Sequence, residues 1–518
     1  MHVGRALTIA GIITLVPYHV HTAGQEAPGT TACSVEALQK QAPQDTTITS
    51  AKIVEPSAGL PRYCQVDGHV AVPDNNVNFR LGLPVTWNSK FYFQGIGGLG
   101  GTMGSLNNGL SRGYASASTD TGHDANDPNW GHNRAKEIDY GHRGTHVTAV
   151  AAKAVTAAYY KRQPAHAYFN GCSNGGRQAL MEVQRYPEDF DGIIAGDPAF
   201  GTPMQLGRVL VYQHMLTSQD NYLTSDAVAL LDKATLAACD AADGLKDGLI
   251  TDPRLCQFKA ETLKCSGSEG GADCLTEGQL ETVRRVYTGV KSPAGEQLAA
   301  PFPVGHEGGS TGWIQWISGP TPPTRRADGT LEFTSNPPSG FRLSEQNFRF
   351  LALAEDDPNY SWRRVKFPDD LPRFRVMTEI LSPLDPDLRP YMARGGKLLM
   401  YHGWADPAIS AYGTIHYNDK VIRAVGGKDR ADQFVRLFLA PGMHHCSGGP
   451  GPNSFDMLPV LEEWVERGTA PTRVIATHST AGRVDRTRPL CPHPQVARYV
   501  GSGSIDDAEN FRCEAPSR

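Results

Sequence analysis

The stretch FNGCSNGGRQAL, from Phe169 to Leu180, indicates the fold of this chain. It contains a G-x-S-x-G pentapeptide over residues 171–175, with Ser173 at its centre. Strand-like residues precede the pentapeptide (166–170), and helix-like residues follow it (175–183). A strand, a tight glycine-rich turn and a helix form the arrangement that holds a nucleophilic serine above a sheet. We therefore predict an α/β fold with a catalytic serine at position 173.

Strand-like and helix-like stretches alternate around this motif, from about Pro73 to Pro198. Strands are expected at 78–85, 90–98, 166–171 and 190–198, and helices at 144–162 and 175–187. Such alternation favours a parallel sheet. The pattern stops after Phe200 and returns with two strand-like stretches that end in polar residues, at 395–407 and 433–446. We expect a sheet domain in two parts, 25–201 and 385–518, interrupted by an insertion at 202–384.

The overall composition fits a large globular protein. The chain has 518 residues, of which 40% are hydrophobic, and its formal net charge is −5. No run of Lys and Arg is dense enough to follow a phosphate backbone, so we expect no nucleic-acid partner. The sequence does not indicate an oligomeric state.

The N-terminus has the layout of a secretory signal peptide. His2 and Arg5 give a weakly basic start, an apolar run covers residues 6–16, and small residues follow at 23–24. The run is too short to cross a bilayer, and no later segment is apolar enough to do so. We predict a signal peptide at 1–24 and a secreted or periplasmic protein; the alternative is a start without structure.

The ten cysteines are consistent with an exported protein, because an even number of cysteines in such a chain suggests that they form disulfides. Cys239 and Cys256 form one close pair in the sequence, and Cys265 and Cys274 form another. No C-x-x-C motif occurs, which argues against a zinc or thioredoxin-like site.

A nucleophilic serine needs a base, and the base needs an acid that orients it. In α/β-hydrolases these follow the serine in the order Asp or Glu, then His. Asp406 follows the first of the two late strands, and His444 and His445 follow the second. A disulfide between Cys172 and Cys446 would fasten the serine turn to the histidine loop and would select His445 as the base. The alternative is two unrelated buried thiols.

These motifs resemble the tannase and feruloyl esterase family. The resemblance rests on Cys172-Ser173, Asp406 and His445-Cys446, and on the runs PGMHHCSGGPGPNSFDMLPVLEEWVERG (441–468) and RTRPLCPHPQVARYVGSG (486–503). It covers nearly the whole mature chain. It implies an α/β-hydrolase fold with a large lid inserted between the nucleophile and the catalytic acid. It also implies two further disulfides, Cys33–Cys64 and Cys491–Cys513.

Three more residues are expected at the reacting ester. The backbone N–H of Asn174 should form one half of an oxyanion hole, and Gly98 in GIGGLGG, or next Gly97, the other half. Those glycines could instead form only a flexible turn. His402 corresponds to a position that faces the substrate in the family, although a structural role is equally open.

An acidic loop lies between Cys239 and Cys256. Three carboxylates so close in sequence repel one another unless a cation lies among them, and Ca²⁺ prefers oxygen ligands. The spacing is not that of an EF-hand, and Asp-Gly turns are common in loops. The resemblance implies a structural Ca²⁺ in the lid, held by side chains of Asp240, Asp243 and Asp247 and by carbonyls of Leu245 and Leu249.

The expected function is that of a secreted serine esterase acting on small aromatic-acid esters of the feruloyl, galloyl or benzoyl type through an acyl-enzyme. Lid aromatics are expected to form its core and, in a few cases, a slot for a flat acyl group. One lid arginine could pair with a substrate carboxylate; the candidates are Arg342, Arg349, Arg363 and Arg364. The alternatives are hydrolysis of terephthalate monoesters and a non-catalytic, calcium-stabilised binding protein.

Overall fold

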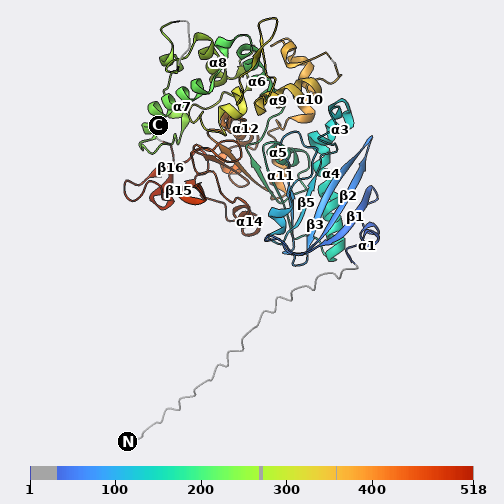
Figure 1. Cartoon of the computed structure of the whole chain (residues 1–518). Coiled ribbons are helices and arrows are strands. Elements are labelled where there is room, and N and C mark those ends of the chain that lie inside the picture. The colour runs from blue at the N-terminus through green and yellow to red at the C-terminus, as the bar shows by residue number, and fades with distance from the viewer. Residues whose placement is uncertain (2–31, 268–271, 358, 517–518) are drawn as a thin grey trace.

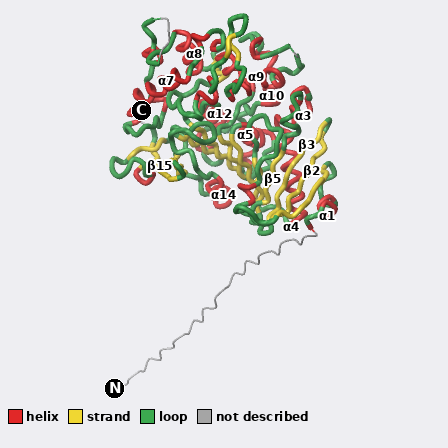
Figure 2. Tube along the Cα trace, in the orientation of Figure 1, coloured by secondary structure: helices red, strands yellow, loops and turns green. Residues whose placement is uncertain are grey.

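A nine-stranded mixed sheet forms the centre of the molecule. The computed structural model describes residue 1 and residues 32–267, 272–357 and 359–516; the expected signal peptide lies almost entirely outside them. The strand order is β1-β2-β3-β5-β4-β6-β7-β12-β13. The strands are β1 (Thr46–Val54), β2 (Tyr63–Val72), β3 (Asn75–Pro84), β4 (Lys90–Gln94), β5 (Ala115–Thr119), β6 (His166–Cys172), β7 (Gly192–Gly196), β12 (Lys397–Gly403) and β13 (Val435–Ala440). Figure 2 shows these strands gathered in one layer, with helices on either side.

The parallel part of this sheet agrees with the expectation from the sequence, whereas its first three strands do not. Strands β5, β4, β6, β7, β12 and β13 run parallel to one another. Strands β1, β2 and β3 pair antiparallel, and β3 also pairs antiparallel with β5. Only Pro73 and Asp74 separate the paired residues Val72 and Asn75, and so short a link permits only a hairpin. The expectation of a purely parallel sheet is therefore wrong for the strand at 78–85.

Helices cover both faces of the sheet because alternate strand residues point to opposite sides. On one face Phe91, Phe93 and Phe169 pack with helices α1 (Val35–Gln39), α4 (Gly144–Tyr160), α5 (Asn174–Arg185) and α12 (Ala411–Ala424). On the other face Tyr92 and Tyr168 pack with α14 (Leu458–Arg467). Other short helices near the sheet are α2 (Asn107–Leu110), α3 (Arg134–Ile138), α11 (Arg389–Ala393) and α13 (Lys428–Ala431).

The segment between β7 and β12 consists of helices joined by long loops and has two hydrophobic clusters of its own. Its helices are α6 (Thr202–Met215), α7 (Ser225–Cys239), α8 (Glu277–Thr288), α9 (Ser339–Gln346) and α10 (Arg375–Leu381). Its strands form two small hairpins, β8 (Val290–Lys291) with β9 (Gln297–Ala299) and β10 (Thr324–Arg325) with β11 (Leu331–Glu332). In Figure 1 these helices, coloured green to orange, gather on one side of the sheet.

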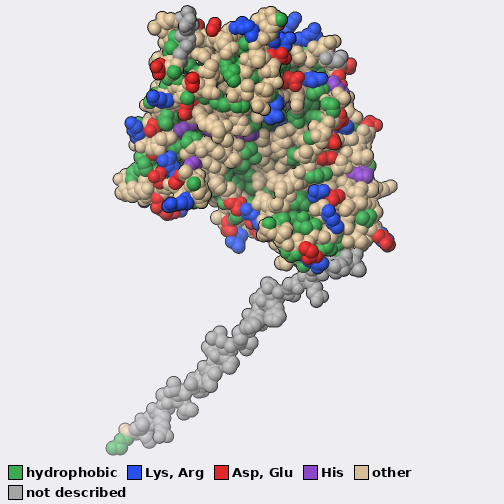
Figure 3. All heavy atoms as spheres, viewed as in Figure 1, with side chains coloured by type: hydrophobic (Ala, Val, Ile, Leu, Met, Phe, Trp, Pro, Cys, Tyr) green, Lys and Arg blue, Asp and Glu red, His purple; other side chains and the backbone are tan. Residues whose placement is uncertain are grey.

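Two C-terminal hairpins complete the fold. They consist of β14 (Val474–Thr480) with β15 (Arg483–Leu490), and β16 (Val496–Tyr499) with β17 (Phe511–Glu514). On the face seen in Figure 3, acidic and basic side chains are intermingled. In the described part of the chain, no helix is both long and apolar enough to cross a bilayer.

All ten cysteines are paired, as predicted. The disulfides are Cys33–Cys64, Cys172–Cys446, Cys239–Cys256, Cys265–Cys274 and Cys491–Cys513. The alternative of two unrelated thiols at Cys172 and Cys446 is therefore excluded.

Candidate active site

Ser173 lies at a sharp turn between β6 and α5. Its φ is 64° and its ψ is −120°, a backbone conformation that non-glycine residues rarely adopt and that stores strain. The neighbouring glycines allow the turn to close. A Cβ on Gly171 would lie 2.6 Å from the carbonyl of Gly175, and one on Gly176 would lie 2.3 Å from the carbonyl oxygen of Gly196. The geometry is that of the nucleophile turn that the motif predicts.

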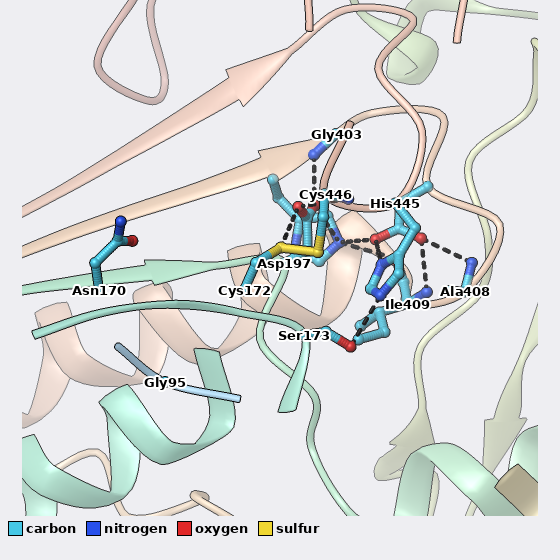
Figure 4. Close-up of a disulfide and its surroundings, with 12 residues drawn as sticks. Gly95, Asn170, Cys172, Ser173, Asp197, Gly403, Ala408, Ile409, His445 and Cys446 are labelled. Carbon is cyan, nitrogen blue, oxygen red and sulfur yellow. Dashed lines mark hydrogen bonds and ion pairs between the residues drawn. A yellow bond between two sulfur atoms is a disulfide. The ribbon is translucent and has the colours of Figure 1, made fainter. Parts of the chain in front are cut away.

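Ser173, His445 and Asp406 are joined by two hydrogen bonds (Figure 4). His445 Nε2 lies 2.9 Å from Ser173 Oγ, and His445 Nδ1 lies 2.8 Å from Asp406 Oδ2. The three residues follow β6, β13 and β12, whose carboxyl ends lie at one edge because these strands are parallel. The structure thus brings together the three residues that were selected from strand ends.

Asp406 is buried and held in its ionised form. Its Oδ1 accepts hydrogen bonds from the backbone N–H groups of Ala408 and Ile409 at 2.7 and 2.9 Å. Burial alone would raise the pKa of Asp406, but His445 and His402 hold it well below its usual range. An ionised carboxylate only accepts hydrogen bonds, so Nδ1 of His445 donates to it. Nε2 is then free to accept the Ser173 proton.

The other histidine, His444, faces away from the serine. Its Nδ1 lies 2.7 Å from Thr311 Oγ1, and its Nε2 lies 3.0 Å from the carbonyl oxygen of His306. Burial lowers the pKa of His444. Of the two histidines, His445 and not His444 therefore lies within hydrogen-bonding distance of Ser173.

Asp197 is a site residue that the sequence analysis missed. Its Oδ2 accepts a hydrogen bond from the N–H of Cys446 at 3.1 Å, and its Oδ1 accepts one from the N–H of Gly403 at 2.8 Å. It therefore lies against the Cys172–Cys446 disulfide, as Figure 4 shows. The available signal was its position directly after β7, a third strand that ends at the same edge.

The expectation that His402 faces the substrate is wrong. Its side chain has no exposed surface, and both ring nitrogens have protein partners. Nδ1 lies 2.8 Å from Thr414 Oγ1, and Nε2 lies 2.8 Å from the carbonyl oxygen of Ile409. Burial alone would lower the pKa of His402, but the carboxylates of Asp197 and Asp406 raise it. His402 is a buried structural residue behind Asp406.

The two expected oxyanion donors lie in the wall of the same cavity as Ser173. Asn174 opens α5, and N–H groups in a first helical turn have no partner within the helix. The loop that carries Gly98 is tied to this helix: Asn174 Nδ2 donates to the carbonyl of Ile96, and the N–H of Ile96 donates to Gln178 Oε1, both at 2.9 Å. Gly98 has a φ of +63°, which suits glycine.

The segment between β7 and β12 forms much of the cavity wall. It contributes Met204, Gln205 and Arg208 from α6, Trp316 from the helical turn 314–318, and Leu343 from α9. The Trp316 ring meets the His445 ring edge to face at 4.8 Å. None of the four arginines nominated from the sequence lines this cavity in the described part of the chain.

The acidic loop is built around its own carboxylates. Asp240 Oδ1 accepts from the N–H groups of Asp247 and Gly248, and Asp243 Oδ1 accepts from that of Leu245. Asp247 pairs with Arg488 of β15 at 2.6 Å. Within the described residues, Asp240 and Asp243 have no cationic side chain within ion-pair distance, and the three carboxylates do not come within 4.8 Å of one another as a group. The donors are therefore those that Ca²⁺ prefers.

Comparison with known proteins agrees with this site. The model of the family "Tannase and feruloyl esterase" matches residues 64–514. Mono(2-hydroxyethyl) terephthalate hydrolase of Piscinibacter sakaiensis is 35% identical, over 89% of this chain and 86% of that protein. A probable feruloyl esterase of Arthroderma benhamiae is 33% identical, over 86% and 84%. The crystal structure of feruloyl esterase B from Aspergillus oryzae superposes with a TM-score of 0.81 at 26% identity, covering 93% of this chain and 99% of that one.

Proposed function

The chain belongs to the tannase and feruloyl esterase family, and from this premise we propose that it is a secreted serine esterase that cleaves aromatic-acid esters through an acyl-enzyme. The observation that carries the proposal is the relay from Ser173 through His445 to Asp406 at the strained turn. Named relatives are esterases, and carboxylic ester hydrolysis is the activity common to them.

The proposed reaction uses each residue in one role. Ser173 Oγ attacks the ester carbonyl while His445 Nε2 takes its proton. The negative charge that develops on the carbonyl oxygen is met by the N–H groups of Asn174 and Gly98. His445 then returns the proton to the leaving alcohol, and a water molecule repeats the sequence to release the acid. Asp406 keeps His445 in the required tautomer and stabilises its charge.

We also propose an α/β-hydrolase scaffold whose segment 202–384 acts as a lid over this site. Support comes from the position of the segment between β7, which precedes Asp197, and β12, which precedes Asp406. It also comes from the contributions of Met204, Trp316 and Leu343 to the cavity wall.

The nucleophile is tested by replacing Ser173 with Ala. The wild-type protein should release one equivalent of p-nitrophenol in a burst from a p-nitrophenyl ester, because the acyl-enzyme forms before it is hydrolysed. Ser173→Ala should show no burst, and kcat should fall on the order of 10⁴-fold or more. Ser502→Ala, at an exposed serine between β16 and β17, is the matched control. A burst from folded Ser173→Ala would point to another nucleophile.

A structural Ca²⁺ remains a proposal for the acidic loop. The ion would be held by side chains of Asp240, Asp243 and Asp247 and by carbonyls of Leu245 and Leu249. Removal of Ca²⁺ with a chelator should lower the melting temperature, because a ligand that binds only the folded state stabilises it. Asp243→Asn should make stability insensitive to the chelator. Metal analysis that finds no calcium, together with an unchanged melting temperature, would refute the site.

A further inference from the structure

The cavity around Ser173 has an excess of positive charge in its wall. Two arginines, Arg177 and Arg208, line it, and no Asp or Glu side chain of the described residues does. Most of the remaining wall is apolar, with Leu99, Met204 and Trp316 among its members. This cavity has a volume of only about 50 Å³, so it can hold the reacting end of a flat substrate, and its positive charge favours a substrate that also carries a negative charge.

Arg177 is fully engaged by the protein. Its Nε donates to Asn174 Oδ1, and its two terminal nitrogens donate to the carbonyls of Tyr140, Gly141 and Leu381. These contacts fix the start of α5 against the helical turn Asp139–Arg143 and the end of α10. Arg177 is therefore part of the scaffold that supports Asn174.

Arg208 is different, because a large part of its hydrogen-bonding capacity has no protein partner. Nη1 donates to Gln205 Oε1 at 3.1 Å, and Nη2 donates to the carbonyl of Ala408. Gln205 is held in turn by Ser344 Oγ at 2.8 Å, which fixes the orientation of the guanidinium. A guanidinium has five N–H donors. Within the described residues, no carboxylate lies within ion-pair distance of Arg208, which is only 8% exposed.

Arg208 also lies where two cavities meet. A second cavity of about 740 Å³ shares Met204, Arg208, Trp316 and Ile409 with the cavity around Ser173. Its volume is within the range of small-molecule sites. A substrate arm that reaches from the reacting ester into this second cavity therefore passes the guanidinium of Arg208.

We propose that Arg208 pairs with a carboxylate carried by the ester substrate, so that the enzyme prefers aromatic esters with a free carboxylate to neutral esters of the same shape. Among the described residues, Asp406 acts on Arg208 only at longer range. A buried cation without a carboxylate in direct contact is costly, and a substrate carboxylate relieves that cost through charge-assisted hydrogen bonds. This inference rests on the proposed function, because it names the substrate class of the Ser173 site.

A purely structural role for Arg208 makes a different prediction. The carbonyl of Ala408 belongs to the turn whose N–H groups hold Asp406. If Arg208 served only to fix that turn, its loss would slow all esters equally. The test therefore compares charged and neutral substrates of the same shape.

Two substrate pairs separate these roles. Monomethyl terephthalate and methyl 4-carbamoylbenzoate differ only by carboxylate or carboxamide on the acid half. The 4-carboxyphenyl and 4-carbamoylphenyl esters of benzoic acid differ in the same way on the alcohol half. Wild-type kcat/KM should favour the charged member of at least one pair by roughly tenfold or more. The pair that shows the preference identifies the half of the ester that contacts Arg208.

Variants complete the test. Arg208→Gln should remove the preference while neutral esters are still hydrolysed, and Arg208→Lys should keep only part of it, because lysine lacks the planar fork. Arg342→Gln, at an exposed arginine of α9 next to the cavity residue Leu343, is the matched control and should change neither pair. Equal loss for charged and neutral esters in Arg208→Gln would overturn the proposal.

The outcomes also separate this inference from the proposed function. If the folded wild-type enzyme hydrolyses no ester, the proposed function fails. If it hydrolyses both members of each pair at equal rates, only the role of Arg208 fails. That comparison needs no variant, so the proposal stays testable even if Arg208→Gln does not fold.

Discussion

At the residue scale, Asp197 links the loop that carries Asp406 to the loop that carries His445. It accepts the N–H of Gly403, at the end of β12, and that of Cys446, which directly follows His445. Burial raises the pKa of Asp197 to about 6; His402 opposes that rise, and Asp406 adds to it. At pH 7 and above Asp197 is therefore mainly ionised and accepts both hydrogen bonds.

Replacing Asp197 with Asn should reduce catalysis more than substrate binding. The amide has one acceptor oxygen, so its NH₂ group would face one of the two backbone donors. A small displacement of His445 should lower kcat roughly ten- to a hundredfold, with KM for a neutral ester little changed. Steady-state kinetics at pH 8, with circular dichroism to confirm folding, would measure this. Wild-type kcat in the folded variant would show that Asp197 does not position the loops.

The site residues that could be predicted from the sequence differ physically from those that could not. Asp406 and His445 could be found because residues after parallel strands meet at one edge of the sheet. That rule predicts where a residue lies, but it does not predict where its side chain points. His402 belongs to β12 itself and points into the interior, and Arg208 lies on a helix where an arginine is normally solvated. Direction and burial depend on packing that a single sequence does not show.

At the scale of the element, helix α5 carries an unusual group, the buried carboxyl of Glu182. Glu182 is fully buried, and neither carboxyl oxygen has a hydrogen-bond partner of good geometry among the described residues. Burial raises the pKa of Glu182 well above its usual value, and the nearby Asp189 adds to this. Asp189 itself contacts Lys153 and His146 of α4. Glu182 is therefore expected to keep its proton in the folded protein above the pH at which an ordinary glutamate ionises.

Replacing Glu182 with Gln should stabilise the protein relative to wild type, increasingly so as pH rises. Between the ordinary and the raised pKa, the folded chain binds one more proton than the unfolded chain, so wild-type stability falls as pH increases. Glutamine has no proton to lose and avoids this fall. The melting-temperature difference, variant minus wild type, should be larger at pH 8.5 than at pH 4.5 by about 2 °C or more. Glu188→Gln, at an exposed carboxylate, is the control, and a pH-independent difference for Glu182→Gln would contradict the expectation.

The elements that the sequence predicted are those with a strong local pattern. Strands β4, β6, β7, β12 and β13 and helices α4 and α5 lie where apolar runs and glycine turns placed them. Strands β1 and β2 precede the stretch in which strands and helices alternate, and they pair directly with neighbouring strands, so that pattern does not include them. Limits for the segment 202–384 could be predicted from the sequence, but its individual elements could not. Its short helices and hairpins depend on contacts between residues that are distant in sequence.

At the scale of the whole molecule, one long-range disulfide connects the end of β6 with the loop after β13. Cys172 precedes the nucleophile, Cys446 follows the base, and their disulfide spans a sequence separation of 274 residues. The intervening chain includes the whole segment between β7 and β12. In Figure 4 the disulfide is drawn beside Ser173 and His445. It therefore joins the two parts of the sheet next to the Ser173–His445 pair.

Replacing both Cys172 and Cys446 with Ala should cost activity even where the protein remains folded. Without the link, the serine turn and the histidine loop can move apart, and a displacement near 1 Å costs roughly a hundredfold in rate. Loss of so large a loop closure should also lower the free energy of unfolding by a few kcal/mol, on the order of 2–5. Activity and ellipticity, measured together against temperature, would separate the two effects.

The control for the double variant is loss of a disulfide that does not touch the site. Replacing Cys265 and Cys274 with Ala removes a link with a sequence separation of 9 residues in the segment between β7 and β12. A shorter loop restricts the unfolded chain less, so this variant should lose less stability. It should also keep wild-type kcat below its melting temperature, since neither cysteine flanks Ser173 or His445. If the Cys172/Cys446 variant likewise kept wild-type kcat while folded, the disulfide would serve stability alone, and Asp197 with the strand framework would suffice to position the base.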